Sequence, residues 1–367
     1  MKISYKQNAV LFYLFIIKFL FIFIAEFGYS KVSQLGDSHR YLESTLTFSA
    51  SVLYSSTALM EFTGAIVKYL QPPLYHFPAM ILSFIGVVIS FNALKKRDVF
   101  RNKWLLYIFI LLNLMPSYLI WTSIHSKEAI ATLFMSYFAV LLINMIDKRE
   151  KVSKVLLLFF CYLLLIFKPQ YFVAIISVAI YLYLLIKFRL NAYLSILLFL
   201  CIFIVQFALL VSVSEYIDLV TLNMYSHFDP ENAKSTRENI YFVNEGDFFR
   251  GMLHGMFLSF WGPTINETIT RPVWAVFFLE SLVIMLVFVF LYFGQIYKLL
   301  SYKFNFIAFG VLFFSLFWLL LVHYPFGIFN PGSAIRYRQN FYPFLVPLLI
   351  FMYHWVTKPP NLDGEIK

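Results

Sequence analysis

The stretch QLGDSHRYLE, residues 34–43, gathers polar side chains directly after a long apolar run. It places Asp37, His39 and Arg40 within four positions. A carboxylate beside basic groups can take a proton from a hydroxyl group. Asp37 is therefore a candidate general base, and His39 and Arg40 are candidate substrate contacts. The alternative is that Asp37 is an ordinary solvated acid of a loop.

A second acidic candidate lies in MPSYLIWTSIHSKEAIATL, residues 115–133. Pro116 can break or kink a helix here, and Ser126 is a residue type that caps helix N-termini. Glu128 suits the positive end of the helix that follows, which is its plain structural role, whereas Lys127 does not. A lysine in this place indicates that an anion such as phosphate is bound, with Glu128 as the second candidate catalytic carboxylate.

Three further basic residues flank apolar runs. Lys168 lies in FKPQY, residues 167–171, and Arg336 and Arg338 lie in IRYRQNFYPFLVP, residues 335–347. The planar fork of an arginine suits bidentate binding of phosphate or pyrophosphate. The alternative for all three is an anchor at the membrane interface, where long basic side chains keep their charge in water.

The composition predicts the scaffold that must position these residues. Hydrophobic residues make up 61% of the 367 residues and charged residues 13%, whereas soluble domains have roughly 45–50% and about 25%. The apolar runs are too continuous for barrel strands, so we expect an all-α polytopic membrane protein. The net charge of +10 is attributed to loops that face an anionic leaflet rather than to nucleic-acid binding.

A bilayer core of about 30 Å needs about 20 helical residues, so each long apolar run is a candidate span. The fifth run is short, and Pro169 separates it from the sixth. We expect about ten transmembrane helices in one integral membrane domain covering residues 1–367. The ten runs are 8–27, 76–94, 104–122, 129–146, 154–167, 170–187, 191–213, 274–297, 304–323 and 341–357.

The positive-inside rule predicts the orientation of the chain. With the N-terminus inside, short inner segments carry 17 of the 29 Lys and Arg residues, so both termini are expected in the cytoplasm. The outer loops are then 28–75, 123–128, 214–273 and 324–340. Within the first of them, SASVLYSSTALMEFTGAIVKYL is expected to form an amphipathic helix on the outer face, with a re-entrant segment as the alternative.

Lys18 is the charge that lies clearly inside a predicted span. It comes ten residues after Asn8, or roughly 15 Å along a helix, so we expect it to face the bundle and to find a partner there. Motifs with the spacing of metal ligands or of a Walker phosphate loop are absent from the sequence. We therefore assign no metal-ligating residues.

The order of these motifs resembles two groups of membrane proteins. GDSHRYL follows the first span, an amphipathic segment precedes the second, PSYLIWTSIHSKEA falls at the next outer loop, and RYRQNFYPFL precedes the last span. This layout resembles GT-C-type glycosyltransferases and the O-antigen and capsule repeat-unit polymerases. The resemblance covers the layout of most of the chain and implies transfer from polyprenyl-pyrophosphate-linked sugars at the outer, periplasmic face of the bacterial inner membrane, in surface polysaccharide biosynthesis.

The resemblance also implies roles for individual residues. Asp37 would be the catalytic acid of the first loop and Glu128 that of the second. The first acid of the family usually belongs to an acidic pair, whereas Asp37 is followed by Ser38, so a divalent metal stays an open alternative. The implied substrate contacts are His39, Arg40, Lys127, Lys168, Arg336 and Arg338.

Two other functions stay open at this point. A flippase for lipid-linked oligosaccharides would usually have twelve or more spans and short loops. A non-catalytic assembly protein or an acyltransferase-like protein is the third candidate. The expected partners are membrane lipid, a lipid-linked saccharide and other membrane proteins of polysaccharide assembly.

Overall fold

The computed structural model describes residues 2–147, 153–228, 235–301 and 306–357. Within these ranges the chain is helical and contains no strand. Seven helices are long and apolar enough to cross a membrane, which confirms an all-α, multi-pass membrane protein. They are α1 (Lys2–Phe23, continued by a π-helical turn at Ile24–Gly28), α4 (Phe77–Lys95), α7 (Lys127–Asp147), α9 (Phe172–Phe188), α10 (Ala192–Ser212), α15 (Trp274–Ser301) and α16 (Phe306–Gly327).

Fewer than ten of the predicted runs form helices of spanning length in the described part of the chain. Residues 104–122 form two helices, α5 (Lys103–Asn113) and α6 (Pro116–Ser123), that meet at an angle of 57° and count as an eighth span if they cross together. The break falls at Pro116, as expected for a residue that cannot continue a helix. The fifth and tenth predicted runs form the shorter helices α8 (Lys154–Phe167) and α18 (Tyr342–Thr357).

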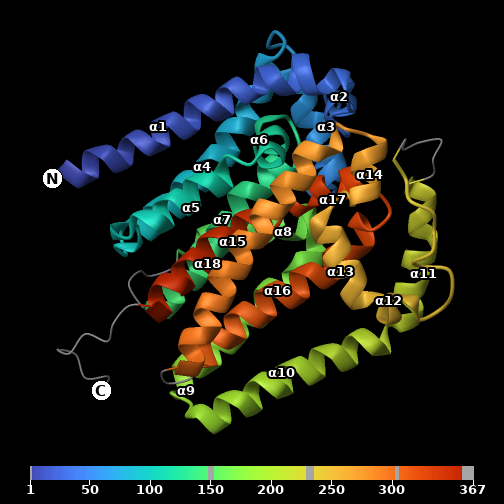
Figure 1. Cartoon of the computed structure of the whole chain (residues 1–367). Coiled ribbons are helices and arrows are strands. Elements are labelled where there is room, and N and C mark those ends of the chain that lie inside the picture. Colours follow the sequence, from blue (N-terminus) through green and yellow to red (C-terminus); the bar gives the residue numbers. More distant parts are fainter. Residues whose placement is uncertain (1, 148–152, 229–234, 302–305, 358–367) are drawn as a thin grey trace.

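The remaining α-helices are short and gather at one end of the bundle (Figure 1). This end is opposite to the one where α1 begins and α18 ends. Most of the segments predicted to be external therefore lie together in space. The helices are α2 (Ser38–Glu43), α3 (Ser56–Val67), α11 (Ser214–Met224), α12 (Asp247–Arg250), α13 (Met252–Trp261), α14 (Ile265–Thr270) and α17 (Pro331–Arg338).

Helices α4 and α7 pack closely against each other. Gly86 of α4 lies so near α7 that a Cβ atom there would stand 2.6 Å from the backbone oxygen of Thr132. Ser126 caps α7 as predicted, because its Oγ accepts a hydrogen bond from the backbone nitrogen of Ala129 at 3.1 Å. By contrast, α10 runs along the outside of the bundle with most of its apolar side chains exposed, which suits contact with lipid (Figure 1).

Lys18 faces the bundle, as predicted. Its side chain is 1% exposed, it donates a hydrogen bond to Oγ1 of Thr122, and its Nζ lies 4.9 Å from the ring centre of Tyr118. These contacts join α1 to α6, the short helix that leads into the first turn of α7.

Candidate functional site

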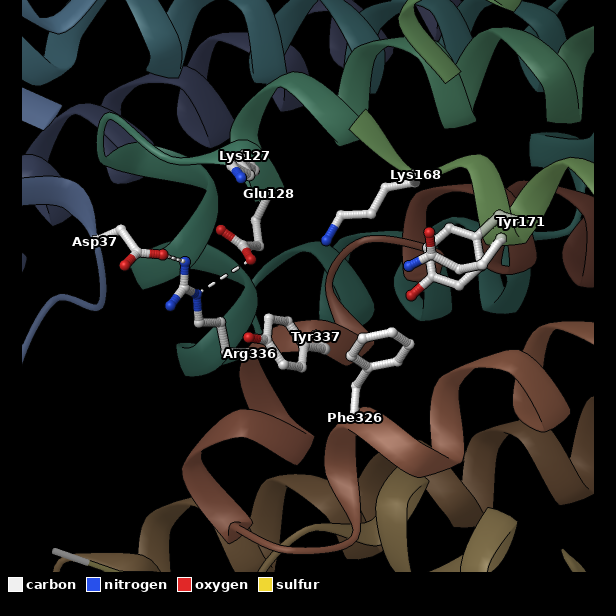
Figure 2. A pocket seen from close by; sticks show the side chains of 9 residues that line it. Asp37, Lys127, Glu128, Lys168, Tyr171, Phe326, Arg336 and Tyr337 are labelled. Atoms are coloured by element: carbon white, nitrogen blue, oxygen red, sulfur yellow. Dashed lines mark hydrogen bonds and ion pairs between the residues drawn. The ribbon is translucent and has the colours of Figure 1, made fainter. Parts of the chain in front are cut away.

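A cavity of about 120 Å³ lies at the end of the bundle where the short helices gather. Its charged lining comes from four separate parts of the chain (Figure 2). Five of the eight predicted site residues meet there: Asp37, Lys127, Glu128, Lys168 and Arg336. The structure thus brings the two candidate carboxylates and three of the candidate phosphate contacts to one place.

Arg336 of α17 links the two carboxylates. Its Nε lies 3.1 Å from Oε1 of Glu128, and its Nη2 lies 3.4 Å from Oδ2 of Asp37. Figure 2 shows the guanidinium between them. The guanidinium carbon also lies 5.2 Å from the ring centre of Trp121. A charge held on two sides by carboxylates and on a third by an aromatic ring has a defined position before any ligand arrives.

Gly36 allows the first loop to approach this arginine. Its φ is +59°, a conformation that L residues with a side chain rarely adopt. A Cβ atom on Gly36 would also overlap Nη1 of Arg336. The glycine of QLGDS therefore fits both the turn and the place of the guanidinium.

Asp37 stands at the open side of the cavity, with 39% of its side chain exposed. Arg40 contacts its Oδ1 at 3.4 Å, and the hydroxyl of Tyr41 donates to its Oδ2 at 3.4 Å. Burial acts to raise the pKa of Asp37, but the nearby charges of Arg336 and Arg40 outweigh burial and lower it. Asp37 is therefore ionised at neutral pH.

Glu128 is held more deeply, with 1% of its side chain exposed. Oε1 accepts from Arg336, whereas Oε2 is buried and has no hydrogen-bond partner among the described residues. An unsatisfied buried acceptor costs about 1–3 kcal/mol. A ligand hydroxyl that enters this cavity would meet an acceptor that the protein itself leaves open.

The two lysines differ in how they are held. Nζ of Lys127 donates to Oγ1 of Thr57 in α3 at 2.9 Å. Nζ of Lys168 lies 5.3 Å from the ring centre of Tyr337, and no side chain or backbone oxygen of the described residues accepts a hydrogen bond from it. Burial lowers the pKa of Lys168 to about 8. The lining of the cavity thus holds three basic side chains and two acidic ones, which favours an anionic ligand.

Arg338 does not join Arg336 in the cavity. It is fully buried and binds Oε1 of Glu280 at 2.8 Å, Oγ of Ser281 at 2.9 Å and the backbone oxygen of Phe260 at 2.9 Å. The two arginines lie in one helix, and residues two positions apart in a helix point to different sides. The expected arginine pair is therefore divided between the cavity and a buried ion pair between α15 and α17.

His39 and Arg40 are also not part of the cavity lining. Both belong to α2, the short helix that follows Asp37. Arg40 is exposed and reaches Asp37 from outside, and its Nε lies 3.9 Å from a carboxylate oxygen of Glu61. Its place is thus beside the first carboxylate rather than within the site.

Sequence reasoning missed four lining residues. Tyr337 stands between Arg336 and Lys168, with its ring centre 5.6 Å from the guanidinium carbon of Arg336. Its position within RYRQ was the signal that could have identified it, whereas Phe326 at the end of an apolar run carried none. The four residues are Gln170, Tyr171, Phe326 and Tyr337.

The site shows no cluster of metal ligands. Among the described residues, no group of three His, Cys, Asp or Glu side chains is close enough to hold a metal ion. Asp37 and Glu128 both face Arg336, so a cation already occupies the position between the carboxylates.

Comparisons with known proteins do not assign the chain to a family. No known protein family, curated protein or solved structure matches the chain.

Proposed function

We propose that the chain is a glycosyltransferase that uses polyprenyl-pyrophosphate-linked sugars at the outer face of a bacterial inner membrane. It would act in surface polysaccharide assembly, either as a repeat-unit polymerase or as a transferase of single sugars. One observation supports this most: three cations and two carboxylates from distant parts of a multi-pass membrane protein line a single cavity.

The cations suit the phosphate groups of the donor. The cavity is smaller than the roughly 300–1,000 Å³ of pockets that enclose whole ligands, so it fits one part of a ligand, such as a phosphate group. Lys168 offers a buried charge without an acceptor, and Arg336 offers a rigid fork. Both charges would stabilise the pyrophosphate as it leaves the sugar.

The carboxylates suit the acceptor hydroxyl. Its oxygen would attack the anomeric carbon of the donor sugar, and the bond from that carbon to the phosphate oxygen would break. The electron pair would leave with the polyprenyl pyrophosphate, and the hydroxyl proton would pass to Glu128 or Asp37. Glu128 is the favoured base because its Oε2 lacks a partner inside the site.

A flippase is less well supported. Such a protein would place charges along a path through the membrane, whereas these charges lie together in one cavity (Figure 2). Lys18, deep in α1, is engaged by Thr122 and Tyr118 and lies outside the cavity lining.

Deletion of the gene, followed by analysis of surface polysaccharide, tests the proposal. A single-repeat product would identify a polymerase, and a truncated repeat would identify a transferase. Accumulation of complete lipid-linked repeats on the cytoplasmic leaflet would support a flippase instead. Unchanged polysaccharide would refute all three. If the cavity is the site, Arg336→Lys must change the polysaccharide in the same direction as the deletion does.

A further inference from the structure

A second, larger hollow lies beside α12, α13 and the end of α16. Its volume is about 660 Å³, within the roughly 300–1,000 Å³ range of ligand pockets. It is lined by the loop that leads into α12, by residues of α12 and α13, and by the end of α16. We call this hollow the groove, and the charged site described above remains the cavity. The groove and the cavity have no lining residue in common.

Arg237 fixes the loop wall of the groove. Its backbone nitrogen donates to the oxygen of Phe329 at 2.7 Å, and its Nη1 donates to the oxygen of Ile328 at 2.7 Å. Its Nη2 donates to the oxygen of Gly262 at 2.6 Å, and its Nε lies 2.7 Å from Oε1 of Glu267. The loop is thereby tied to the turn that leads into α17, so the groove has a defined wall rather than a mobile one.

The surface of the groove combines aromatic rings with polar groups. The ring of Tyr241 stacks on that of His254, with centres 6.5 Å apart and planes 26° apart. Asp247 and Arg250 form an ion pair at 3.6 Å, so their charges offset one another, and Asn244 adds a side-chain amide. The groove therefore has no excess charge from these residues, in contrast to the cavity.

The groove and the cavity share the last turns of α16. Phe326 lines the cavity, whereas Tyr324 and Ile328 line the groove. Residues two apart in a helix face different sides, so the two hollows lie on different sides of the end of α16. Both hollows therefore border the same helix end.

We infer that the groove binds the saccharide chain of the acceptor. A pyranose ring presents C–H groups that pack on an aromatic face, which Tyr241 supplies, and hydroxyls that pair with amide, carboxylate and guanidinium groups, which Asn244, Asp247 and Arg250 supply. A neutral, hydroxyl-rich ligand matches a groove without excess charge. The inference rests on the proposed function, because the cavity alone is too small for a saccharide.

The test uses the full chain in lipid nanodiscs and a defined probe. The probe is the free oligosaccharide released by mild acid from the lipid-linked saccharides of the cells that encode the protein. Binding is measured by saturation-transfer NMR and titration. Tyr241→Ala should weaken binding about tenfold or more, whereas Tyr241→Phe should stay close to the unaltered protein because the ring remains.

Two further variants distinguish the loss of a groove contact from misfolding of the protein. His254→Ala removes the stacked ring at an exposed position and should also weaken binding several-fold. Tyr216→Ala removes an exposed tyrosine of α11 outside the groove and should leave binding unchanged. Absence of probe binding to the unaltered protein, or equal binding by Tyr241→Ala, His254→Ala and the unaltered protein, would overturn the inference.

The failure of this inference and the failure of the proposed function give different results. Arg336→Lys should slow sugar transfer from the lipid-linked donor roughly ten- to a hundredfold and leave probe binding intact, because Arg336 lies in the cavity. Transfer by the unaltered protein without any effect of Tyr241→Ala on probe binding would refute the groove alone. Probe binding that depends on Tyr241, together with no transfer activity, would refute the proposed function and leave a saccharide site.

Discussion

Arg336 Nε lies 3.1 Å from Oε1 of Glu128, which joins α17 to the first turn of α7 across 208 residues of sequence. Both side chains are largely buried, so each is the main charge partner of the other. Removing one partner of such a pair leaves a buried charge without compensation, which is strongly destabilising. Substitutions at this pair should therefore keep the charge or the shape.

Arg336→Lys keeps the charge but loses the planar fork. A lysine ammonium cannot hold Glu128 and Asp37 in the way that the guanidinium does and still bind phosphate. Loss of one charge-assisted hydrogen bond costs about 1.5–3 kcal/mol, or roughly ten- to a hundredfold in rate. We expect shortened or absent polysaccharide in cells that contain matched membrane levels of the variant.

Arg40→Lys is the matched control, because Arg40 also touches Asp37 but is exposed and lies outside the cavity lining. It should retain nearly normal polysaccharide. Full-length polysaccharide from both variants would show that Arg336 is an anchor without a role in transfer.

Glu128→Gln should impair transfer more than Asp37→Asn. Glutamine keeps the shape of the side chain and removes the base, and a positioned general base contributes about 10²–10⁴ in rate. Asp37 is more exposed than Glu128 and has Arg40 and Tyr41 as additional partners. The measurement is the transfer rate of purified variants at saturating donor, and a larger loss for Asp37→Asn would assign the base to Asp37 instead.

Gly36→Ala should displace the guanidinium of Arg336, although the two residues are far apart in the sequence. The added Cβ would overlap Nη1, and the positive φ adds strain of about 1–2 kcal/mol. Gly246→Ala separates these effects, because Gly246 has φ +79° but open space around its Cβ position. Both variants should lose thermal stability, whereas Gly36→Ala should also lose transfer activity. Equal activity in the two variants would count against a steric link to Arg336.

The lowered pKa of Lys168 predicts that anion binding depends on pH. Burial lowers its pKa to about 8, so the amine is protonated below this pH and neutral above it. Affinity for inorganic pyrophosphate should therefore fall as pH rises through about 8, although a bound anion will shift the fall to somewhat higher pH. Lys168→Arg should hold its affinity to higher pH, since arginine stays charged. A flat profile in the unaltered protein would exclude Lys168 from the anion site.

The predicted orientation is open to chemical labelling. Cysteines at Thr47 and Glu245 occupy exposed positions in two segments predicted to be external, and one at Lys96 occupies an exposed position at the opposite loop. An impermeant thiol reagent added to intact cells should label the first two and not the third. Labelling at position 96 alone would reverse the orientation and place the cavity in the cytoplasm.

The sequence by itself predicted the class of fold and selected five of the residues that line the cavity. Continuous apolar runs can only satisfy their backbone groups as helices in a membrane, so helices occur at every predicted run. Charged residues are rare in this chain, so those that flank the apolar runs stand out. For this reason the pattern of residue types is enough to select Asp37, Glu128, Lys168 and Arg336.

Tertiary structure alone decided which of these charges meet. Arg336 and Arg338 are equivalent by type and spacing, but the helix turns one toward the cavity and the other toward Glu280. The fit of Gly36 against Arg336 and the place of Phe326 also depend on contacts between segments about three hundred and about two hundred residues apart along the chain. Helical periodicity tells which residues share a face, whereas the rotation and packing of whole helices determine what that face meets.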